Sequence, residues 1–250
     1  MSAIEQLFSS LEHIGETVQG LDALAFVWML GIWIAYTLFA NYRGKTHTCL
    51  ASVLLLYRKQ WLLRMLKRDN RIADANLLDQ LRSSVSFFAS TTILVIAGLA
   101  TGMAASEQGL SILSHLPVAA TDTRELWEYK ILVMIGIFVY AFFEFSWSVR
   151  LYNYAAVFIG SGPLSVEVEA NDAWADAYAE SGARTISMAA KHFNYGLRAY
   201  YFGLATLAWF VSAWLYLVLV SAVVIILYRR EFHSKALRTM AYSPTGDGRV

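Results

Sequence analysis

The chain has 250 residues, of which 57% are hydrophobic and 16% are charged, a balance outside the range of soluble globular proteins. With a net charge of +1, the chain has no overall positive field that would recruit nucleic acid. The single cysteine, Cys49, excludes an internal disulfide and any multi-cysteine metal site. The sequence therefore predicts an all-α, polytopic membrane protein with four transmembrane helices, amphipathic surface helices and cytoplasmic helical extensions.

The first forty residues indicate how the chain enters the membrane. Ser2 to Glu5 reads as a capping box, and apolar residues then recur on one face, which predicts an amphipathic helix at the membrane surface. No Lys or Arg precedes Arg43, so this segment is not expected to be a secretory signal peptide. Residues 21–40 form the first predicted span. Its acidic beginning and basic end place the N-terminus outside.

Residues 50–68 predict an amphipathic helix with a strongly basic face. Its apolar positions fall on one arc and its charged positions on most of the other, which is typical of a helix lying in the headgroup layer. We expect each basic residue to gain about 1 kcal/mol from anionic lipid on the cytoplasmic side. Nucleic acid is a disfavoured alternative, because the opposite face is needed for burial. The residues expected to contact lipid headgroups are Lys59, Arg64, Lys67 and Arg68.

Residues 73–105 predict one long helix, whose membrane-embedded part forms the second span, residues 83–105. One stripe of this helix carries hydroxyl side chains, and small residues lie beside it. Close contact with another helix is the usual role of such a face, and a hydroxyl-lined pore is the alternative. Hydroxyls in a helix can bond to the preceding turn, which favours packing. The stripe consists of Ser83, Ser86, Ser90, Ala97 and Thr101. Gly98 and Gly102 form a small-xxx-small pair beside it, and the residues expected to pack against another helix are Ala97, Gly98 and Gly102.

The third predicted span, residues 131–150, is apolar but contains a carboxylate. Glu144 lies six residues before Arg150, so it sits about 9 Å inside that end of the span at about 1.5 Å per residue. A carboxylate at this depth costs about 2–3 kcal/mol unless it is protonated, paired or turned toward protein. Glu144 and Arg150 are about 120° apart around a helix, so each is expected to find a partner on another helix.

Glu144 and its polar neighbours have two interpretations. They form either a relay for protons or ions, or hydrogen bonds that lock the helices of the bundle together. The sequence alone does not decide between these two roles. The residues assigned to this polar path or bundle lock are Glu144, Ser148, Arg150 and Asn153 of the third stretch, together with Ser86, Ser90 and Thr91 of the second.

Residues 164–198 are too polar to form a span, and they carry four carboxylates on one helical face. Four carboxylates at this spacing repel one another unless cations meet them. Ion pairing with the basic segment 58–71 or plain solvation is expected, a divalent cation is the alternative, and no metal site is predicted. His192 follows as either a proton carrier or a structural residue. The four carboxylates are Glu169, Asp172, Asp176 and Glu180.

The fourth predicted span, residues 199–228, completes a single domain over residues 1–235, followed by a flexible tail over 236–250. Four spans put both termini on one side of the membrane. With both outside, thirteen Lys and Arg residues fall in the inner loops and seven in the outer parts, so the positive-inside rule favours this orientation. The basic C-terminal tail disagrees, since a tail on the inside would require three or five crossings.

Several motifs support a family assignment. They are Asn41–Gly44, Ser83–Thr92, Phe145–Ser148 with Asn153–Tyr154, and Phe193–Tyr201. In these motifs the chain resembles a bacterial inner-membrane family known as domain of unknown function 599. The resemblance covers about residues 20–235 and implies a multi-pass protein of the bacterial inner membrane. It implies no activity and no catalytic residues.

These patterns predict a homo-oligomeric channel- or transporter-like protein for an ion or small solute, because one four-span subunit can barely enclose a polar path. The alternative is a non-catalytic membrane scaffold or assembly partner of a larger complex. An enzyme is least expected, since the sequence has no catalytic motif and its five histidines lack ligand spacing. No cofactor is expected, and the expected partners are the lipid bilayer, anionic headgroups and further copies of the chain.

Overall fold

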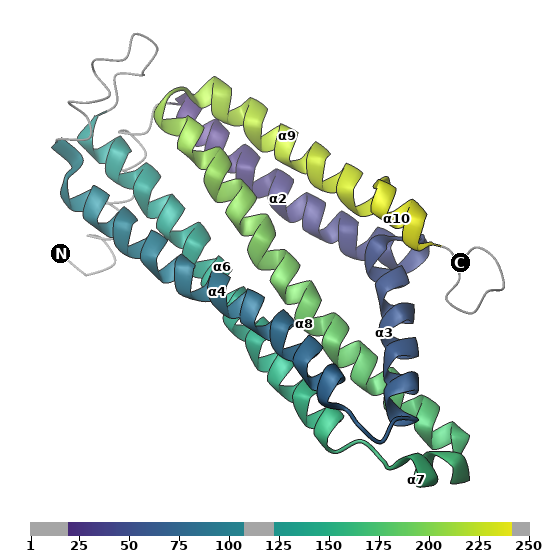
Figure 1. Cartoon of the computed structure of the whole chain (residues 1–250). Coiled ribbons are helices and arrows are strands. Elements are labelled where there is room, and N and C mark those ends of the chain that lie inside the picture. Colours follow the sequence, from purple (N-terminus) through teal and green to yellow (C-terminus); the bar gives the residue numbers. More distant parts are fainter. Residues whose placement is uncertain (1–19, 108–122, 242–250) are drawn as a thin grey trace, which may run out of the picture.

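The computed structural model describes residues 20–107 and 123–241, and in these residues the fold is built from helices without strands (Figure 1). This confirms the predicted all-α class. The surface helix predicted before residue 20 and the tail after residue 241 lie outside the described residues. The helices are α2 (Gly20–Thr46), α3 (Leu50–Leu66), α4 (Ile72–Ala104), α6 (Arg124–Gly160), α7 (Ser165–Ala170), α8 (Asp172–Thr206), η1 (Leu207–Phe210), α9 (Ala213–Phe232) and α10 (Lys235–Met240).

Four helical stretches are long and apolar enough to cross a membrane. They are Gly20–Gly44, Ile72–Ala104, Arg124–Gly160 and Ala213–Met240, which confirms the prediction of four membrane-spanning helices. The last stretch includes α10, so the first residues of the segment predicted as a flexible tail are helical. Ser234 caps this short helix, because its side chain accepts a hydrogen bond from the backbone N–H of Leu237.

The fourth span begins later than the sequence predicts. Residues 199–228 were expected to form one helix, but α8 ends at Thr206 and α9 begins at Ala213. Tertiary contacts hold the turn between them: the Trp209 indole donates to Asp22, and the Trp209 carbonyl accepts from Lys130. These partners come from distant parts of the chain, which is why the local sequence did not reveal the break.

Helix α8 runs through the bundle together with the four apolar stretches (Figure 1). We call the end of the bundle where α8 meets η1 the η1 end, and the opposite end, which carries α7, the α7 end. Helices α2 and α9 run parallel, since Trp28 bonds to Ser221 and Phe39 contacts Phe232 further along. The described chain therefore starts at the η1 end and finishes at the α7 end. Helix α8 runs the length of the bundle between α6 and α9, so the two ends of the described chain lie toward opposite ends of the bundle. On which side of a membrane each chain end lies stays a prediction.

The contact between α6 and α8 lies at the centre of the bundle. Small residues recur every seven positions along the face of α8 that meets α3 and α6, and all of them are buried. A Cβ added at Gly196 would overlap the Phe145 ring, and one added at Gly203 would lie 2.9 Å from Phe138. These two helices therefore approach as closely as the missing side chains allow. The recurring small residues are Ala175, Gly182, Ala189, Gly196 and Gly203.

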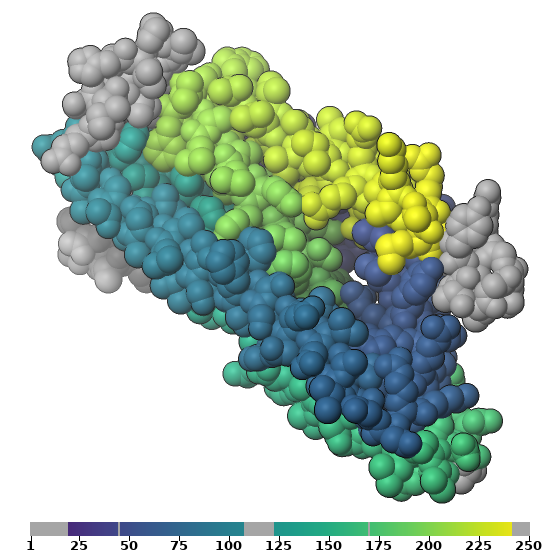
Figure 2. Space-filling model, in the orientation of Figure 1, coloured from purple at the N-terminus to yellow at the C-terminus, as the bar shows by residue number. Residues whose placement is uncertain are grey.

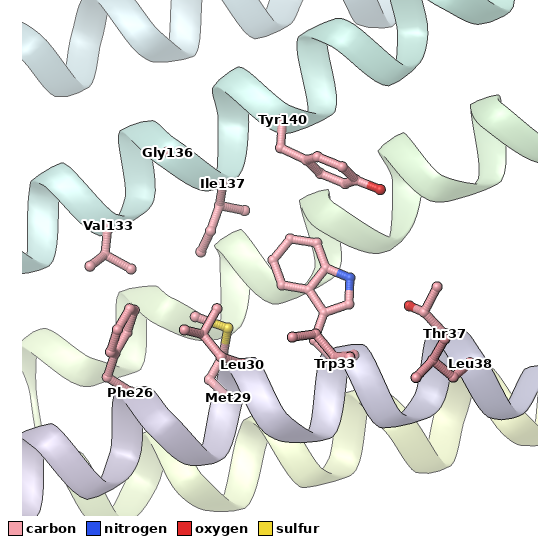
Figure 3. A pocket seen from close by; sticks show the side chains of 11 residues that line it. Phe26, Met29, Leu30, Trp33, Thr37, Leu38, Val133, Gly136, Ile137 and Tyr140 are labelled. Carbon is pink, nitrogen blue, oxygen red and sulfur yellow. The ribbon is translucent and has the colours of Figure 1, made fainter.

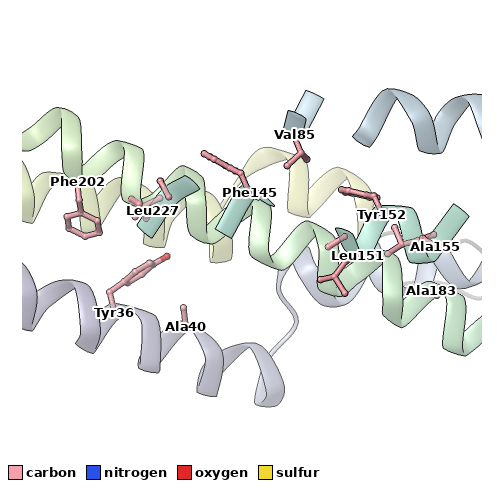
Figure 4. Close-up of a cluster of buried hydrophobic side chains, with 14 of the residues drawn as sticks. Tyr36, Ala40, Val85, Phe145, Leu151, Tyr152, Ala155, Ala183, Phe202 and Leu227 are labelled. Atoms are coloured by element: carbon pink, nitrogen blue, oxygen red, sulfur yellow. The ribbon is translucent and has the colours of Figure 1, made fainter. Parts of the chain in front are cut away.

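The hydrophobic core follows this contact and extends to α2 and α9. Tyr36, Phe145 and Phe202 are among its buried side chains, and Figure 4 shows them between the helices. Toward the α7 end the core is formed by Leu151, Ala155 and smaller side chains of α8. One continuous core thus joins the apolar stretches to the more polar helices at the α7 end.

The α7 end extends beyond α10 as a narrow projection, visible in Figure 2. Helix α3 packs along α8 there, burying Leu62, Met65 and Leu66. Arg71 joins the α3–α4 connection to the α6–α7 connection. Its guanidinium donates to the carbonyls of Gly162 (2.8 Å) and Pro163, and to the carbonyl of Ile159 (3.3 Å) at the end of α6. This arrangement satisfies carbonyl groups at the end of α6 that have no partner within the helix.

Candidate functional site

A carboxylate and an imidazole meet inside the bundle. The Oε2 atom of Glu144 on α6 lies 2.7 Å from Nδ1 of His192 on α8, and the side chains are 16% and 29% exposed. The prediction that Glu144 finds its partner on another helix is confirmed. The close approach of α6 and α8 produces this contact, because Ser148 lies one turn along on the same side and bonds to α8 as well.

Aromatic rings surround the Glu144–His192 pair. The rings of Trp147 and Tyr195 lie edge-on to the imidazole, with centroids at 6.3 Å and 5.8 Å. Tyr140, one helical turn before Glu144, interacts with its carboxylate. These rings shield the pair from part of the solvent, and the carboxylate and the imidazole lie in contact, so a proton can pass between them.

A second set of polar contacts joins this pair to α2. The Tyr195 hydroxyl donates to Oδ1 of Asn41 at 2.8 Å. The guanidinium of Arg198 lies over the rings of Tyr36 and Tyr195, at 5.1 Å and 5.5 Å from their centroids. Nη1 of Arg198 is buried and has no hydrogen-bond partner among the described residues. An unpaired N–H of this kind is costly within a protein interior, which marks Arg198 as a group that can accept an anionic partner.

An apolar groove of about 510 Å³ opens between α2 and α6 beside these polar groups (Figure 3). Trp33 stands in the groove between the two helices, with its ring stacked on Phe202 of α8 at 4.9 Å and edge-on to Tyr140 at 5.6 Å. Gly136 lines the opposite wall, where an added Cβ would meet no atom within 4 Å. The groove is thus apolar along its length and reaches polar groups near Tyr140.

A buried ion pair closes the η1 end. Nζ of Lys130 lies 3.4 Å from Oδ1 of Asp22, and these side chains are only 1% and 9% exposed. Lys130 also donates to the carbonyl of Trp209 at 3.1 Å, and the Trp209 indole donates to Asp22 at 2.7 Å. The ammonium and the carboxylate are therefore both paired and hydrogen-bonded, as buried charges must be. This set joins α2, α6 and η1.

The other polar residues predicted on the third stretch have separate roles. The Ser148 hydroxyl donates to the Ala189 carbonyl of α8 at 2.7 Å, which is a contact that locks two helices. Arg150 is exposed and lies over Trp147 of its own helix, 5.9 Å from the ring centroid, and the part of the chain that the structure describes offers it no partner on another helix. Asn153 lines a smaller cavity of about 260 Å³ between α4 and α6.

The polar and small residues predicted on the second span lie away from the Glu144–His192 pair. Ser86 and Thr91 are half-buried and Ser90 is exposed, and the Thr91 hydroxyl donates to the Phe87 carbonyl of its own helix. Ala97 and Gly98 are exposed, and an added Cβ on Gly98 would meet no atom within 4 Å. At Gly102 the nearest atom would be Cδ1 of Ile131, 4.0 Å away. Within the chain, this face therefore makes little contact with other helices.

The basic helix and the acidic face meet in part. Lys59 on α3 pairs with Asp176 at 2.9 Å and with Glu180 at 3.4 Å, and the hydrogen bond to Asp176 raises the pKa of Lys59. Arg184 pairs with Glu180 at 2.7 Å. The ion pairing expected for the acidic face is thus present at two of its carboxylates, whereas Glu169 and Asp172 are exposed.

The remaining cations of α3 differ in their surroundings. Arg68 pairs with the buried carboxylate of Asp74 at 3.0 Å, while Arg64 and Lys67 are exposed. Burial lowers the pKa of Arg58, which donates to the Ser187 hydroxyl at 3.1 Å. The apolar side of α3 is covered by protein, because α8 packs against it. Contact of the exposed cations with lipid headgroups stays a prediction.

Metal ligation finds no support in the described residues, where no group of three His, Cys, Asp or Glu side chains converges. The sequence analysis overlooked the residues that complete the site. Asn41, Tyr195 and Arg198 all lie in motifs that were noted for the family resemblance, and a polar residue within or beside a predicted span was the available signal. The pairing of Lys130 with Asp22 has no signal in the sequence, since it depends on the turn at Trp209.

The comparisons with known proteins leave the site without a characterised counterpart. No curated protein and no solved structure matches the chain. One family model matches residues 24–236, which is most of the chain and includes every residue of the cluster described above except the early charge Asp22. The chain therefore belongs to the family described as Protein of unknown function, DUF599.

Proposed function

We propose that this protein is a channel- or transporter-like membrane protein that moves protons or another small ion and works as a homo-oligomer. The observation that carries the proposal is the contact between Glu144 and His192, 2.7 Å apart on two helices of the bundle. Ionisable side chains at membrane depth are costly, and in membrane proteins they mark ion or proton pathways. An imidazole and a carboxylate in contact can pass a proton between them near neutral pH.

The same residues offer a route toward the α7 end. Tyr195 contacts the imidazole ring of His192 and donates to Asn41, which lies near the end of α2. Lys191 lies beside Tyr195 at 5.5 Å from the ring centroid and is exposed. A proton that reaches Glu144 is therefore one hydrogen bond from His192, which adjoins the exposed Lys191 in the chain. Ser148 has a structural part in this proposal, since its hydroxyl is used by the Ala189 carbonyl.

We further propose that the protein lies in the bacterial inner membrane with the α7 end in the cytoplasm. Because α8 passes through the bundle, the basic residues of 43–82, 150–191 and 229–238 gather at this end, sixteen in all. Arg124 and Lys130 are the basic residues near the η1 end. The positive-inside rule then favours an orientation in which α2 begins outside the cytoplasm and α10 ends in the cytoplasm. The basic C-terminal segment, which conflicts with a four-span topology, agrees with this one.

Self-association would use α4, which packs against α6 and leaves its other side exposed. Ser90, Ala97 and Gly98 lie on that exposed side. Small residues allow two helices to approach closely in lipid, where apolar burial alone gives little drive for association. A contact between copies through α4 would leave the Glu144–His192 pair intact in each subunit.

Ion movement can be measured in vesicles that contain the purified protein and a pH-sensitive dye. We expect a pH gradient to decay faster than in empty vesicles, and the effect to disappear in Glu144→Gln and in His192→Gln. Glu169→Gln, which changes an exposed carboxylate on α7, is the matched control and should behave like the wild-type protein. If wild-type vesicles pass no proton, metal cation or small anion faster than empty ones, the proposal is wrong.

A scaffold role is the second candidate, and one observation favours it. Leu164, Val166 and Trp174 are exposed apolar side chains at the α7 end, outside the apolar stretches. Exposed apolar residues away from lipid are typical of surfaces that bind another protein. Extraction in a mild detergent would distinguish the two roles, because a scaffold should be recovered with a partner in a fixed ratio and lose it when Val166 and Trp174 are both changed to Ser.

A further inference from the structure

We propose that the groove between α2 and α6 holds one acyl chain of an anionic phospholipid whose headgroup is bound by Arg198 and Lys191. This proposal does not depend on ion movement, so it can succeed or fail independently of the function proposed above. It also concerns residues different from the cations of α3 that the sequence assigned to lipid contact.

The groove has the length and chemistry of a single acyl chain. On α2 its lining runs from Phe26 to Leu38, about 18 Å at 1.5 Å per residue, which is slightly more than half of the ~30 Å hydrocarbon core. The lining is formed by aliphatic and aromatic side chains, with the hydroxyls of Thr37 and Tyr140 near one end. A chain that enters from one leaflet would therefore fill it with its polar end beside Tyr140 (Figure 3).

The polar groups at that end carry an excess of positive charge. Lys191 and Arg198 lie on the two sides of Tyr195, each 5.5 Å from its ring centroid. Arg198 also interacts electrostatically with Tyr140 in the groove, and it lies one helical turn from Phe202, on which Trp33 stacks. His192 is paired with Glu144, so the Glu144 carboxylate does not neutralise either of these cations directly.

Arg198 supplies the group that selects an anion. Its Nη1 atom is buried without a hydrogen-bond partner among the described residues, although the guanidinium is held over two aromatic rings. Side chains on a helix lean toward its N-terminus, and α8 starts at the α7 end, so Arg198 leans toward the level of Asn41 and Tyr195. A phosphate at this level could accept from Arg198 and lie close to Lys191. Basic pockets between membrane helices on the cytoplasmic side bind anionic headgroups in this way.

The test uses the full chain in phosphatidylcholine vesicles and a phosphatidylglycerol probe with a photoreactive diazirine on its acyl chain. The matched probe is phosphatidylcholine with the same labelled chain. After irradiation, mass spectrometry locates the labelled residues. We expect about tenfold more labelling of the α2 and α6 groove residues by phosphatidylglycerol than by phosphatidylcholine. Both headgroups offer a phosphate to Arg198, but the trimethylammonium of phosphatidylcholine places a further positive charge beside Arg198 and Lys191.

Two variants separate the apolar and the charged parts of the site. Gly136→Leu adds a side chain to the groove wall at a position where a Cβ meets no atom within 4 Å, and it should reduce groove labelling by both probes at least fivefold. Gly31→Leu adds the same side chain to α2 in open space away from the groove, and should leave labelling unchanged. Arg198→Gln should bring labelling by phosphatidylglycerol down to the level of phosphatidylcholine. Because Gly136→Leu keeps every charged group, it tests whether the groove holds an acyl chain even if Arg198→Gln does not fold.

Three results would overturn the proposal. The first is equal labelling by the two probes in the wild-type protein, which would indicate ordinary lipid contact. The second is unchanged labelling in Gly136→Leu. The third is a groove occupied by something else: either a diazirine fatty acid that outcompetes phosphatidylglycerol at equal concentration, or cross-links from α2 or α6 of one copy to a second copy of the chain.

Discussion

Helices α4 and α8 both carry small residues at helical spacing, and the two faces lie in contrasting surroundings. On α8 the small residues are buried against α3 and α6, and an added Cβ at Gly196 would overlap the Phe145 ring. On α4 the face of Ala97 and Gly98 is exposed, and an added Cβ at Gly98 would meet open space. Regular spacing of small residues thus indicates that a helix can be approached closely, but it does not say whether the approaching helix belongs to the same chain.

The largest expected difference comes from placing a leucine on each face. Gly196→Leu should destabilise the fold by about 3 kcal/mol, because the side chain must displace a buried aromatic ring. Gly98→Leu should change stability by less than about 0.5 kcal/mol, since nothing in the chain lies in its way. Thermal unfolding of both variants in the same detergent measures the contrast.

Gly196→Ala serves as the graded control, since it adds only the Cβ that overlaps Phe145. We expect its melting temperature to fall between those of the wild-type protein and Gly196→Leu. Equal melting temperatures for Gly196→Leu and Gly98→Leu would mean that α8 is not packed more tightly at Gly196 than α4 is at Gly98.

A smaller difference is expected between two hydroxyl groups. Ser148→Ala removes a buried bond from α6 to the Ala189 carbonyl of α8 and should cost about 1 kcal/mol. Thr91→Ala removes a bond that lies within α4 and should have almost no effect. Chemical unfolding in mixed detergent micelles compares the two variants, and a greater loss in Thr91→Ala would contradict the central position of the α6–α8 contact.

The contact of α8 with α3 should depend weakly on pH. Bonding to Asp176 raises the pKa of Lys59 in the folded protein, so the pair stabilises the fold below the unfolded pKa of Lys, and this contribution is lost as pH rises through the folded pKa. The pair is partly exposed, so about 0.5 kcal/mol is expected. Lys59→Met should therefore be less stable than the wild-type protein at pH 8, and the difference should disappear as the pH rises beyond the ordinary pKa of Lys. If the difference in stability between Lys59→Met and the wild-type protein grew at high pH, the Lys59–Asp176 pair would not stabilise the fold in the way described.

The smallest effect on the fold accompanies a change in assembly. Gly98→Leu is expected to unfold like the wild-type protein but to form smaller particles, because the added side chain keeps neighbouring copies apart. Native mass spectrometry from a mild detergent measures the particle mass, and Gly31→Leu on α2 is the control for a leucine added to another exposed face. An unchanged particle mass would exclude this face of α4 as the contact between copies.

The sequence predicted the apolar helices well and α8 poorly, for a physical reason. Helices α2, α4 and α6 face lipid on at least one side, so long apolar runs reveal them. Helix α8 lies among them and packs through Gly182, Gly196 and Gly203, which contribute little hydropathy, while His192 and Arg198 lower its average further. A criterion based on apolar runs therefore misses a helix that is surrounded by other helices.

The same limit applies to the site. The position of Glu144 well inside an apolar span required that its carboxylate be paired, protonated or turned toward protein. The structure confirms that it is paired. Its partner could not be named, because His192 reaches it only through the register between α6 and α8. Arg198 and Asn41 join the cluster only because their helices pack together. They lie on α8 and α2, far apart in the chain, so their spacing in the sequence does not indicate that they meet.

The ion pair at the η1 end bears on how the molecule can change shape. Separating α2 from α6 at that end would leave Lys130 or Asp22 unpaired in a buried setting, at a cost of about 3–5 kcal/mol. At the opposite end α2 is attached through a neutral hydrogen bond from Tyr195 to Asn41, which costs only about 1 kcal/mol to break. We therefore expect motion that parts α2 from its neighbours to be smallest near Trp209 and largest at the end of α2 that carries Asn41.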